Sequence, residues 1–381
     1  MQGDSMAVKI RRSGSFASHV GQTAAGCKAQ TGPANAPAAS RRIVRDRVNG
    51  YSGGAIQDHD MTVSPLDDFR ALLAALPPLD DVARDAALAQ FVNSGIAGSR
   101  LAAIAAQVAA TAGRKPSVSR PQLALFAGAH GVARLGVSDR RIDATMSAVA
   151  AFGSGDAPAS HLCAANMVGL KVYDLALHLP TGDISRQPAM DERSCAATLA
   201  FGMEAIAGGP DLVIVSAVRS AGDDVVAHAL LGALFANLPA DAGLSQQGAL
   251  AVADALKRHA GGASDALSAL ADLGGREIAA CVGAIVAARS EKLPVILDGL
   301  TALTAAAVVH ALNADAVGHC MIAEVDGAVS KLVVARLGLT QLLGGGYEAG
   351  EGTAGVVAVG LVKDALSLQA GLSAHARATA H

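Results

Sequence analysis

The sequence predicts an α/β fold in which a parallel, Rossmann-like sheet carries helices on both faces and is completed by a small helical subdomain. From residue 123 onward, short apolar runs alternate with longer Ala-rich stretches. Strands that alternate with helices favour right-handed crossovers and therefore parallel pairing. Hydrophobic residues make up 51% of the chain, yet only 3% of residues are aromatic and Trp is absent. Small side chains must fill much of the core, which favours tightly packed helices.

The chain divides into three predicted parts. Residues 1–60 are rich in Ser, Gly, Ala and Arg and show no hydrophobic period, which indicates a disordered leader. This leader is either an ill-defined extension, with Met61 as an alternative start, or a functional tail such as a targeting peptide. Residues 61–118 place apolar residues at helical spacing and predict a helical subdomain segment. Residues 119–381 form the predicted α/β domain.

Five short apolar runs are predicted to be the strands of the sheet. Ligands bind at the edge where the carboxyl ends of parallel strands gather. His130, Asp298 and His319 each follow a predicted strand, so we expect them at this edge. The predicted strands are Leu123–Ala127, Gly169–Leu175, Leu212–Ala217, Val295–Leu297 and Ala316–Gly318.

Composition and charge argue against several classes of protein. The net charge of -3 and the few aromatic side chains provide neither a basic footprint nor a stacking surface for nucleic acid. The five cysteines are widely spaced and contain no CxxC pair, so neither a disulfide framework nor a zinc site is indicated. Apolar runs such as Leu212–Val218 end well before the roughly 20 residues that a membrane span needs. We predict a soluble protein of the reducing cytoplasm.

A carboxylate framed by glycines is the strongest chemical signal in the chain. The tetrapeptide Gly350-Glu351-Gly352-Thr353 stands just before an apolar run that is predicted to be a helix. Glycines on both sides allow the backbone to approach a ligand closely. A carboxylate in such a cleft is suited to accept a proton. The alternative is a solvated glutamate beside a helix cap.

Five motifs, in the right order over about residues 76–373, resemble those of the nicotinate-nucleotide:dimethylbenzimidazole phosphoribosyltransferase family. The family motifs read approximately FAGDHGV, GVS, GGxE, LDG and GEGTGA. The corresponding segments here are FAGAHGV at 126–132, GVS at 136–138, GGRE at 274–277, LDG at 297–299 and GEGTAG at 350–355.

The resemblance implies a specific reaction. A benzimidazole nitrogen attacks C1 of the ribose of nicotinate mononucleotide, nicotinate leaves, and the α-ribazole phosphate of the cobalamin lower ligand forms with inversion. The attacking azole must lose its N–H proton, and Glu351 matches the general base of the family. Because the leaving pyridine already carries positive charge, no metal or cofactor is implied, and alignment must supply most of the acceleration. The resemblance also implies a homodimer with the site near the subunit contact.

The resemblance further suggests which residues hold the two substrates. His130 and His319 lack a paired His or Cys at ligand spacing, so no metal site is predicted. We assign nucleotide and phosphate binding to Gly274, Gly275, Gly350, Gly352, Thr353, His319 and Arg219, and base binding to Ser138, Met146 and Ala349.

Several ligand-binding positions depart from the family pattern. Ala217 stands in place of a second carboxylate, within a segment, Ser216–Asp224, that has lost most of the glycines that cradle phosphate. Asp223 and Asp224 would oppose an anion at that helix start. The lysine expected near Gly248 is missing as well.

These losses leave a second hypothesis open. The protein would then be a non-catalytic paralogue of the same fold that binds a base or nucleotide, or that forms a heterodimer with an intact relative. The degraded Ser216–Asp224 segment favours this paralogue, whereas the intact loop around Glu351 favours the enzyme.

Overall fold

The computed structural model describes residues 9–12, 64–92, 94–96, 98–113, 116–239, 243–260 and 265–379. The predicted leader, residues 1–60, lies outside this range except for Lys9–Arg12. These four residues form strand β1, which pairs in parallel with β3.

Seven strands in the described part of the chain form one sheet in the order β1-β3-β2-β4-β5-β6-β7, and every neighbouring pair is parallel. The predicted α/β class with a parallel sheet is therefore confirmed, and four of the five predicted strands are found within two residues of their expected ends. After β1, the strands are β2 (Pro121–Ala127), β3 (Gly169–Asp174), β4 (Leu212–Ala217), β5 (Val295–Asp298), β6 (Cys320–Ile322) and β7 (Thr340–Gln341).

The strand predicted at Ala316–Gly318 is wrong. The side chain of Asn313 accepts a hydrogen bond from Asp315 N, and this cap turns the chain into a 3-10 helix, η3 (Ala314–Val317). The strand begins only at Cys320, so His319 precedes β6 instead of following a strand. Its carbonyl accepts a hydrogen bond from Val295 N, at the start of β5. The expectation that His319 lies at the carboxyl edge is therefore also wrong.

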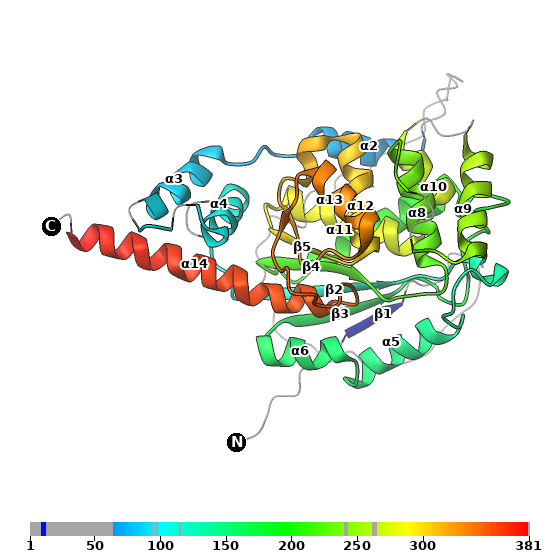
Figure 1. Cartoon of the computed structure of the whole chain (residues 1–381), viewed down its shortest axis with the longest axis horizontal. Helices are drawn as coiled ribbons and strands as arrows, with labels where there is room; N and C mark the ends of the chain where they lie inside the picture. Colours follow the sequence, from blue (N-terminus) through cyan, green and yellow to red (C-terminus); the bar gives the residue numbers. More distant parts are fainter. Residues whose placement is uncertain are drawn as a thin grey trace, which may run out of the picture. The chain divides into compact units, whose positions relative to one another are not determined.

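Helices cover both faces of the sheet (Figure 1). Alternate residues of the central strands point to opposite faces, which builds two apolar clusters. Ala124 and Phe126 of β2 join the cluster beneath α8, α11 and α12, while Leu123 and Leu125 join the one beneath α6 and α14. The helices are α2 (Asp67–Ala74), α3 (Asp81–Val92), α4 (Arg100–Ala112), α5 (Ala144–Ser154), α6 (Pro158–Asn166), α7 (Glu192–Gly202), α8 (Asp223–Leu234), α9 (Gln246–His259), α10 (Ala266–Leu273), α11 (Arg276–Ser290), α12 (Leu300–Leu312), α13 (Gly327–Leu337) and α14 (Thr353–Thr379), with the 3-10 helices η1 (Gly131–Leu135) and η2 (Met203–Ile206).

The segment predicted as a helical subdomain, residues 61–118, holds α2, α3 and α4. Helices α3 and α4 contact each other and the last helix, α14, as Figure 1 shows. Phe69 of α2 instead packs into the cluster beneath α11 and α12. Helix α14 thus packs against two helices from the early part of the chain, α3 and α4.

Helix α14 contains a stretch, Thr353–His375, that is long and apolar enough to cross a membrane by length and composition alone. Its residues Val356, Val359 and Val362 are fully buried, in the same cluster as Ile214 of β4 and Ile296 of β5. Burial against the sheet accounts for this composition, as in the core helix of a water-soluble domain.

Glycines allow the small-residue helices α7 and α11 to approach closely. A Cβ added at Gly283 of α11 would overlap the carbonyl oxygen of Leu199, and one added at Gly202 of α7 would overlap the backbone of Ala280. Protein interiors are packed too densely to absorb such an overlap without a backbone shift.

We therefore expect Gly283→Ala to destabilise the protein by about 1–3 kcal/mol or more, through overpacking between α7 and α11. Gly360→Ala is the matched control, because a Cβ at this position of α14 meets nothing within 4 Å. That variant should gain about 0.5–1 kcal/mol from the lower entropy of its unfolded chain. Urea unfolding midpoints compare the two, and equal midpoints would contradict the packing argument.

Candidate active site

The turn that carries Glu351 has an unusual backbone. Gly350, Glu351 and Gly352 have φ values of 105°, 53° and 85°, so three successive residues lie in the region that favours glycine. A left-handed conformation at a residue with a Cβ costs about 1–2 kcal/mol and persists only where the surroundings fix it. Glu351 is thus held in place against its own backbone preference.

Asp298, at the end of β5, anchors this turn. Its Oδ1 accepts a hydrogen bond of 2.7 Å from Gly350 N, and its side chain is almost fully buried. Burial raises the pKa of Asp298 to about 6, an effect that the backbone N–H groups of Gly350, Gly355 and Gly352 partly oppose. The side chain therefore holds the turn from a site where its charged form is disfavoured.

Arg219, in the loop after β4, contacts the same turn through its backbone and its side chain. Its backbone N–H donates to Glu351 Oε1 at 3.0 Å. Its Nη2 donates to the carbonyl of Ala349 at 3.1 Å and pairs with Glu348 Oε1 at 3.0 Å. The half-buried Glu351 side chain is thereby directed at the strand-end loop of β4, away from open solvent.

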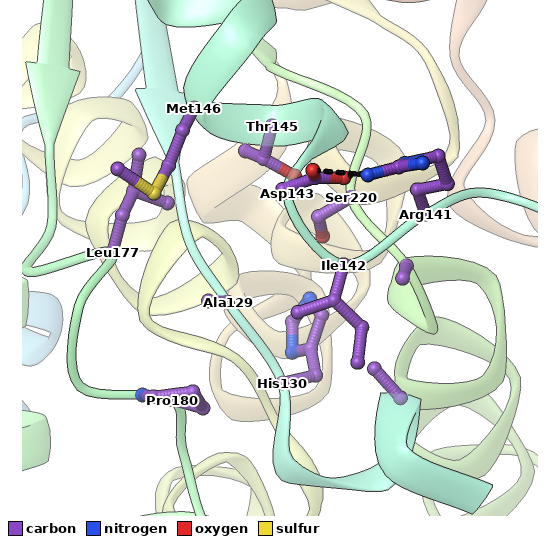
Figure 2. Close-up of a pocket in the computed structure, with 12 residues that line it drawn as sticks. Ala129, His130, Arg141, Ile142, Asp143, Thr145, Met146, Leu177, Pro180 and Ser220 are labelled. Atoms are coloured by element: carbon purple, nitrogen blue, oxygen red, sulfur yellow. Dashed lines mark hydrogen bonds and ion pairs between the residues drawn. The ribbon is translucent and has the colours of Figure 1, made fainter. Parts of the chain in front are cut away.

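Two cavities lie at this edge of the sheet. The first, which we call the apolar cavity, has a volume of about 450 Å³ (Figure 2). The second, the polar cavity, has a volume of about 520 Å³. Both fall in the range of small-molecule sites. The apolar cavity is lined chiefly by Ala129, Ile142, Met146, Leu177, Pro180 and Ala221, and the polar cavity includes Arg140, Arg219, Asp223, Asp298, Thr301 and Glu324.

The loop after β4 contributes residues to both cavities. Arg219 lines the polar cavity, whereas the next residue, Ser220, lines the apolar one. Thr145, also in the apolar cavity, donates its hydroxyl to Arg219 O at 3.3 Å. Glu351 itself lines neither cavity, but its Oε1 accepts a hydrogen bond from the backbone N–H of Arg219, a residue that lines the polar cavity.

The structure divides the residues predicted to bind the base. Met146 lines the apolar cavity and is drawn in Figure 2, but Ser138 and Ala349 line the polar one. Among the residues assigned to the nucleotide, Arg219 and Gly350 line the polar cavity.

The other residues assigned to the nucleotide lie elsewhere. Gly352 packs on Leu123, and Thr353 Oγ1 donates to the carbonyl of Gly350 at 2.9 Å, so both shape the turn. Gly274 and Gly275 precede α11 and belong to neither cavity lining. His319 is fully buried at the opposite end of the sheet, where its Nε2 lies 3.0 Å from Ile285 O. Burial lowers the pKa of His319 to about 3.

Beside the apolar cavity lies a buried polar pair of His130, which was predicted to lie at this edge of the sheet, and Glu277, which was not assigned to the site. His130 Nε2 lies 3.5 Å from Glu277 Oε1, and both side chains are almost fully buried. No hydrogen bond to the described residues satisfies either ring nitrogen or either carboxylate oxygen. A Cβ at Gly128 would overlap the Glu277 carboxylate, which explains why this motif position is glycine. Glu277 also lies in the first turn of α11, where the helix dipole favours negative charge.

Arg140 is a second residue that the sequence interpretation missed. It is exposed and lines the polar cavity two residues after Ser138 of the GVS motif. Asp223 lines the same cavity, and desolvation raises its pKa to about 6 although His130 acts in the opposite direction. Within the described residues, no group of three or more His, Cys, Asp or Glu is arranged to hold a metal ion.

Comparison with known proteins gives the class and then the family. Over residues 77–379 the chain matches the family model described as Phosphoribosyltransferase. The nicotinate-nucleotide–dimethylbenzimidazole phosphoribosyltransferase of Agrobacterium fabrum is 44% identical over 326 residues, which span 82% of this chain and 94% of that protein. Its namesake from Sinorhizobium medicae is 43% identical over 327 residues, or 82% and 96% of the two chains. The chain belongs to the nicotinate-nucleotide–dimethylbenzimidazole phosphoribosyltransferase family, which confirms the resemblance seen in its motifs.

A solved structure supports the same conclusion. The crystal structure named for this enzyme from Thermus thermophilus aligns with a TM-score of 0.71 at 26% identity and covers 76% of this chain and 96% of that chain. The shared architecture thus extends over nearly the whole of that protein.

The raised pKa of Asp298 predicts a pH dependence of stability. In the unfolded chain this group ionises near 3.8, but in the folded protein it ionises near 6. The folded state therefore binds more protons between these values, and stability falls as pH rises from about 4 to above 6. The contribution of Asp298 to this loss is on the order of 3 kcal/mol. Asp298→Asn should remove it, while a similar contribution from Asp223, whose pKa is also raised to about 6, remains.

Urea unfolding of the wild type and Asp298→Asn at several pH values between 4 and 7 measures this difference. Asp254→Asn, which removes an exposed carboxylate from α9, controls for the change in net charge. Parallel stability profiles for wild type and Asp298→Asn would show that the carboxyl is not desolvated as described.

Proposed function

We propose that this protein transfers the phosphoribosyl group of nicotinate mononucleotide to a benzimidazole-like base, forming the α-ribazole phosphate of the cobalamin lower ligand. The observation that carries the proposal is the Glu351 carboxylate, held by the backbone of Arg219 in the loop after β4, which contributes residues to both an apolar and a polar cavity. The names of relatives at 42–44% identity support it. The fold and the names of the relatives add nothing in favour of the non-catalytic paralogue beyond the altered Ser216–Asp224 segment.

The apolar cavity suits the acceptor base. Met146, Leu177 and Ile142 offer a surface for a flat, weakly polar ring system, and burial of apolar area drives its binding. A base seated there presents its ring edge to the loop after β4, whose Arg219 N holds Glu351. Because Glu351 lines neither cavity, it takes the N–H proton through one bridging water as the other ring nitrogen attacks.

The polar cavity suits the nucleotide. Arg219 supplies positive charge, and the start of α12 at Gly299, Leu300 and Thr301 offers backbone N–H groups without an acidic residue in its first turn. As the new bond to C1 forms, the bond from C1 to the pyridine nitrogen breaks, and its electrons neutralise the pyridinium. Nicotinate leaves without needing a proton donor, so the residues of both cavities act mainly by alignment.

This arrangement changes two of the sequence assignments. Ser138 and Ala349 are proposed to contact the nucleotide side of the site, because they line the polar cavity. Gly350, Gly352 and Thr353 are proposed to position Glu351 through the shape of their turn.

We also propose that the protein is a cytoplasmic homodimer, as the family resemblance implies. Sedimentation equilibrium measures the mass in solution. The four cysteines among the described residues are free and buried, which is compatible with a reducing compartment.

Glu351→Gln should leave the binding of nicotinate mononucleotide nearly intact and lower kcat by at least about 10²-fold, because the amide keeps the shape of the side chain but cannot accept the proton. Isothermal calorimetry measures binding, and a coupled assay of nicotinate release measures turnover. Absence of nucleotide binding to the wild type at millimolar concentration would eliminate the transferase. An unchanged kcat in the variant would place the base elsewhere.

A further inference from the structure

The side chain of Arg219 is already engaged in the free protein. Its Nη2 pairs with Glu348 Oε1 at 3.0 Å and donates to Ala349 O at 3.1 Å. The Arg219 side chain is 38% exposed and the Glu348 side chain 73% exposed, so this ion pair lies at the open rim of the site. Glu348 is three residues before Glu351 and belongs to the same turn.

The polar cavity is otherwise unfavourable for an anion. Five carboxylates line it, and the lining residues that carry positive charge are two arginines, Arg140 and Arg219. An anionic ligand in this cavity must find its counter-charge on these two side chains. The carboxylates in the lining belong to Asp223, Asp224, Asp298, Glu324 and Asp326.

Those carboxylates are not free to bind the arginines, because backbone groups hold several of them. Glu324 accepts from the N–H groups of Gly345 and Tyr347, and Asp326 accepts from Ala349 N at 3.2 Å. Glu348 differs, because within the described residues its carboxylate contacts only Arg219. The Glu348 carboxylate can therefore release Arg219 without breaking the hydrogen bonds that hold the turn around Glu351.

We propose that Glu348 occupies, in the free protein, the place on Arg219 that the 5′-phosphate of the nucleotide takes on binding. This inference rests on the proposed function and names the anion subsite of that site. The subsite consists of Arg219, Arg140 and the N–H groups at the start of α12, with Glu348 as a competitor that the phosphate displaces. A nucleoside without phosphate does not displace it.

The expected interaction energies favour the phosphate over Glu348 as the partner of Arg219. An exposed ion pair changes an equilibrium by about two- to fivefold. A phosphate monoester carries nearly two negative charges and binds arginine through two parallel hydrogen bonds, each of which shifts an equilibrium by about tenfold or more. The exchange also leaves the hydrogen bond from Arg219 N to Glu351 in place, because that donor is main chain.

Calorimetric titration of the full-length protein tests the inference, with nicotinate mononucleotide and its dephosphorylated nucleoside as probes. Glu348→Gln should lower Kd for the nucleotide by about two- to fivefold and leave Kd for the nucleoside unchanged. Glu291→Gln, which removes an exposed carboxylate at the far end of α11, controls for the change in net charge.

A double-mutant cycle makes the test specific. Arg219→Gln should weaken nucleotide binding by about tenfold or more, and Glu348→Gln should then have no further effect in that background. Arg84→Gln, on the surface of α3, is the matched arginine control. If the wild type fails to bind the nucleotide, the proposed function fails and this inference with it. If the nucleotide binds but Glu348→Gln leaves Kd unchanged, or shifts nucleotide and nucleoside equally, the competition is refuted while the proposed function stands.

Discussion

The hydrogen bond from Gly350 N to Asp298 Oδ1 is the interaction on which the geometry of the site depends. It joins the end of a central strand to the residue before Glu351, and the almost complete burial of Asp298 strengthens it. Ser216 of β4 donates its hydroxyl to Asp298 O at 2.9 Å, so the same residue also ties two neighbouring strands together. The sheet would survive the loss of this contact through its core, but the position of Glu351 relative to both cavities would not be fixed.

Most of the sheet can be predicted from the sequence, because every residue of β2, β4 and β5 is buried and these strands read as largely apolar runs, while β3 keeps Leu170, Val172 and Tyr173 buried. Strand β6 is harder to locate. It is three residues long, and the preceding residues, Ala316 and Val317, are equally apolar and buried. A single side-chain cap from Asn313 selects the 3-10 turn, and this weak local signal decides on which edge of the sheet His319 lies.

The site is predictable where it depends on local sequence and unpredictable where it depends on packing. Glu351 is singled out by the glycines beside it, and Arg219 by its place after a strand. No sequence period reports that Ser138 and Met146 line different cavities, because both cavities are completed by the loop after β4, far along the chain. The charges expected at Ala217 and Gly248 are absent, yet β4 and α9 form at these positions all the same, so the fold tolerates the departure from the family pattern.

Because the backbone at Glu351 is left-handed, stability favours glycine at this position whereas catalysis needs the glutamate carboxylate. Glycine would relieve the strain there, so selection for thermal resistance alone would tend to recover glycine and discard the proton acceptor. A glutamate retained in such a conformation indicates selection for a property other than the stability of the fold. The same reasoning gives a rule for engineering more thermostable variants of this protein. Residue 351 must be kept constant in any mutagenesis library that is screened for thermostability alone.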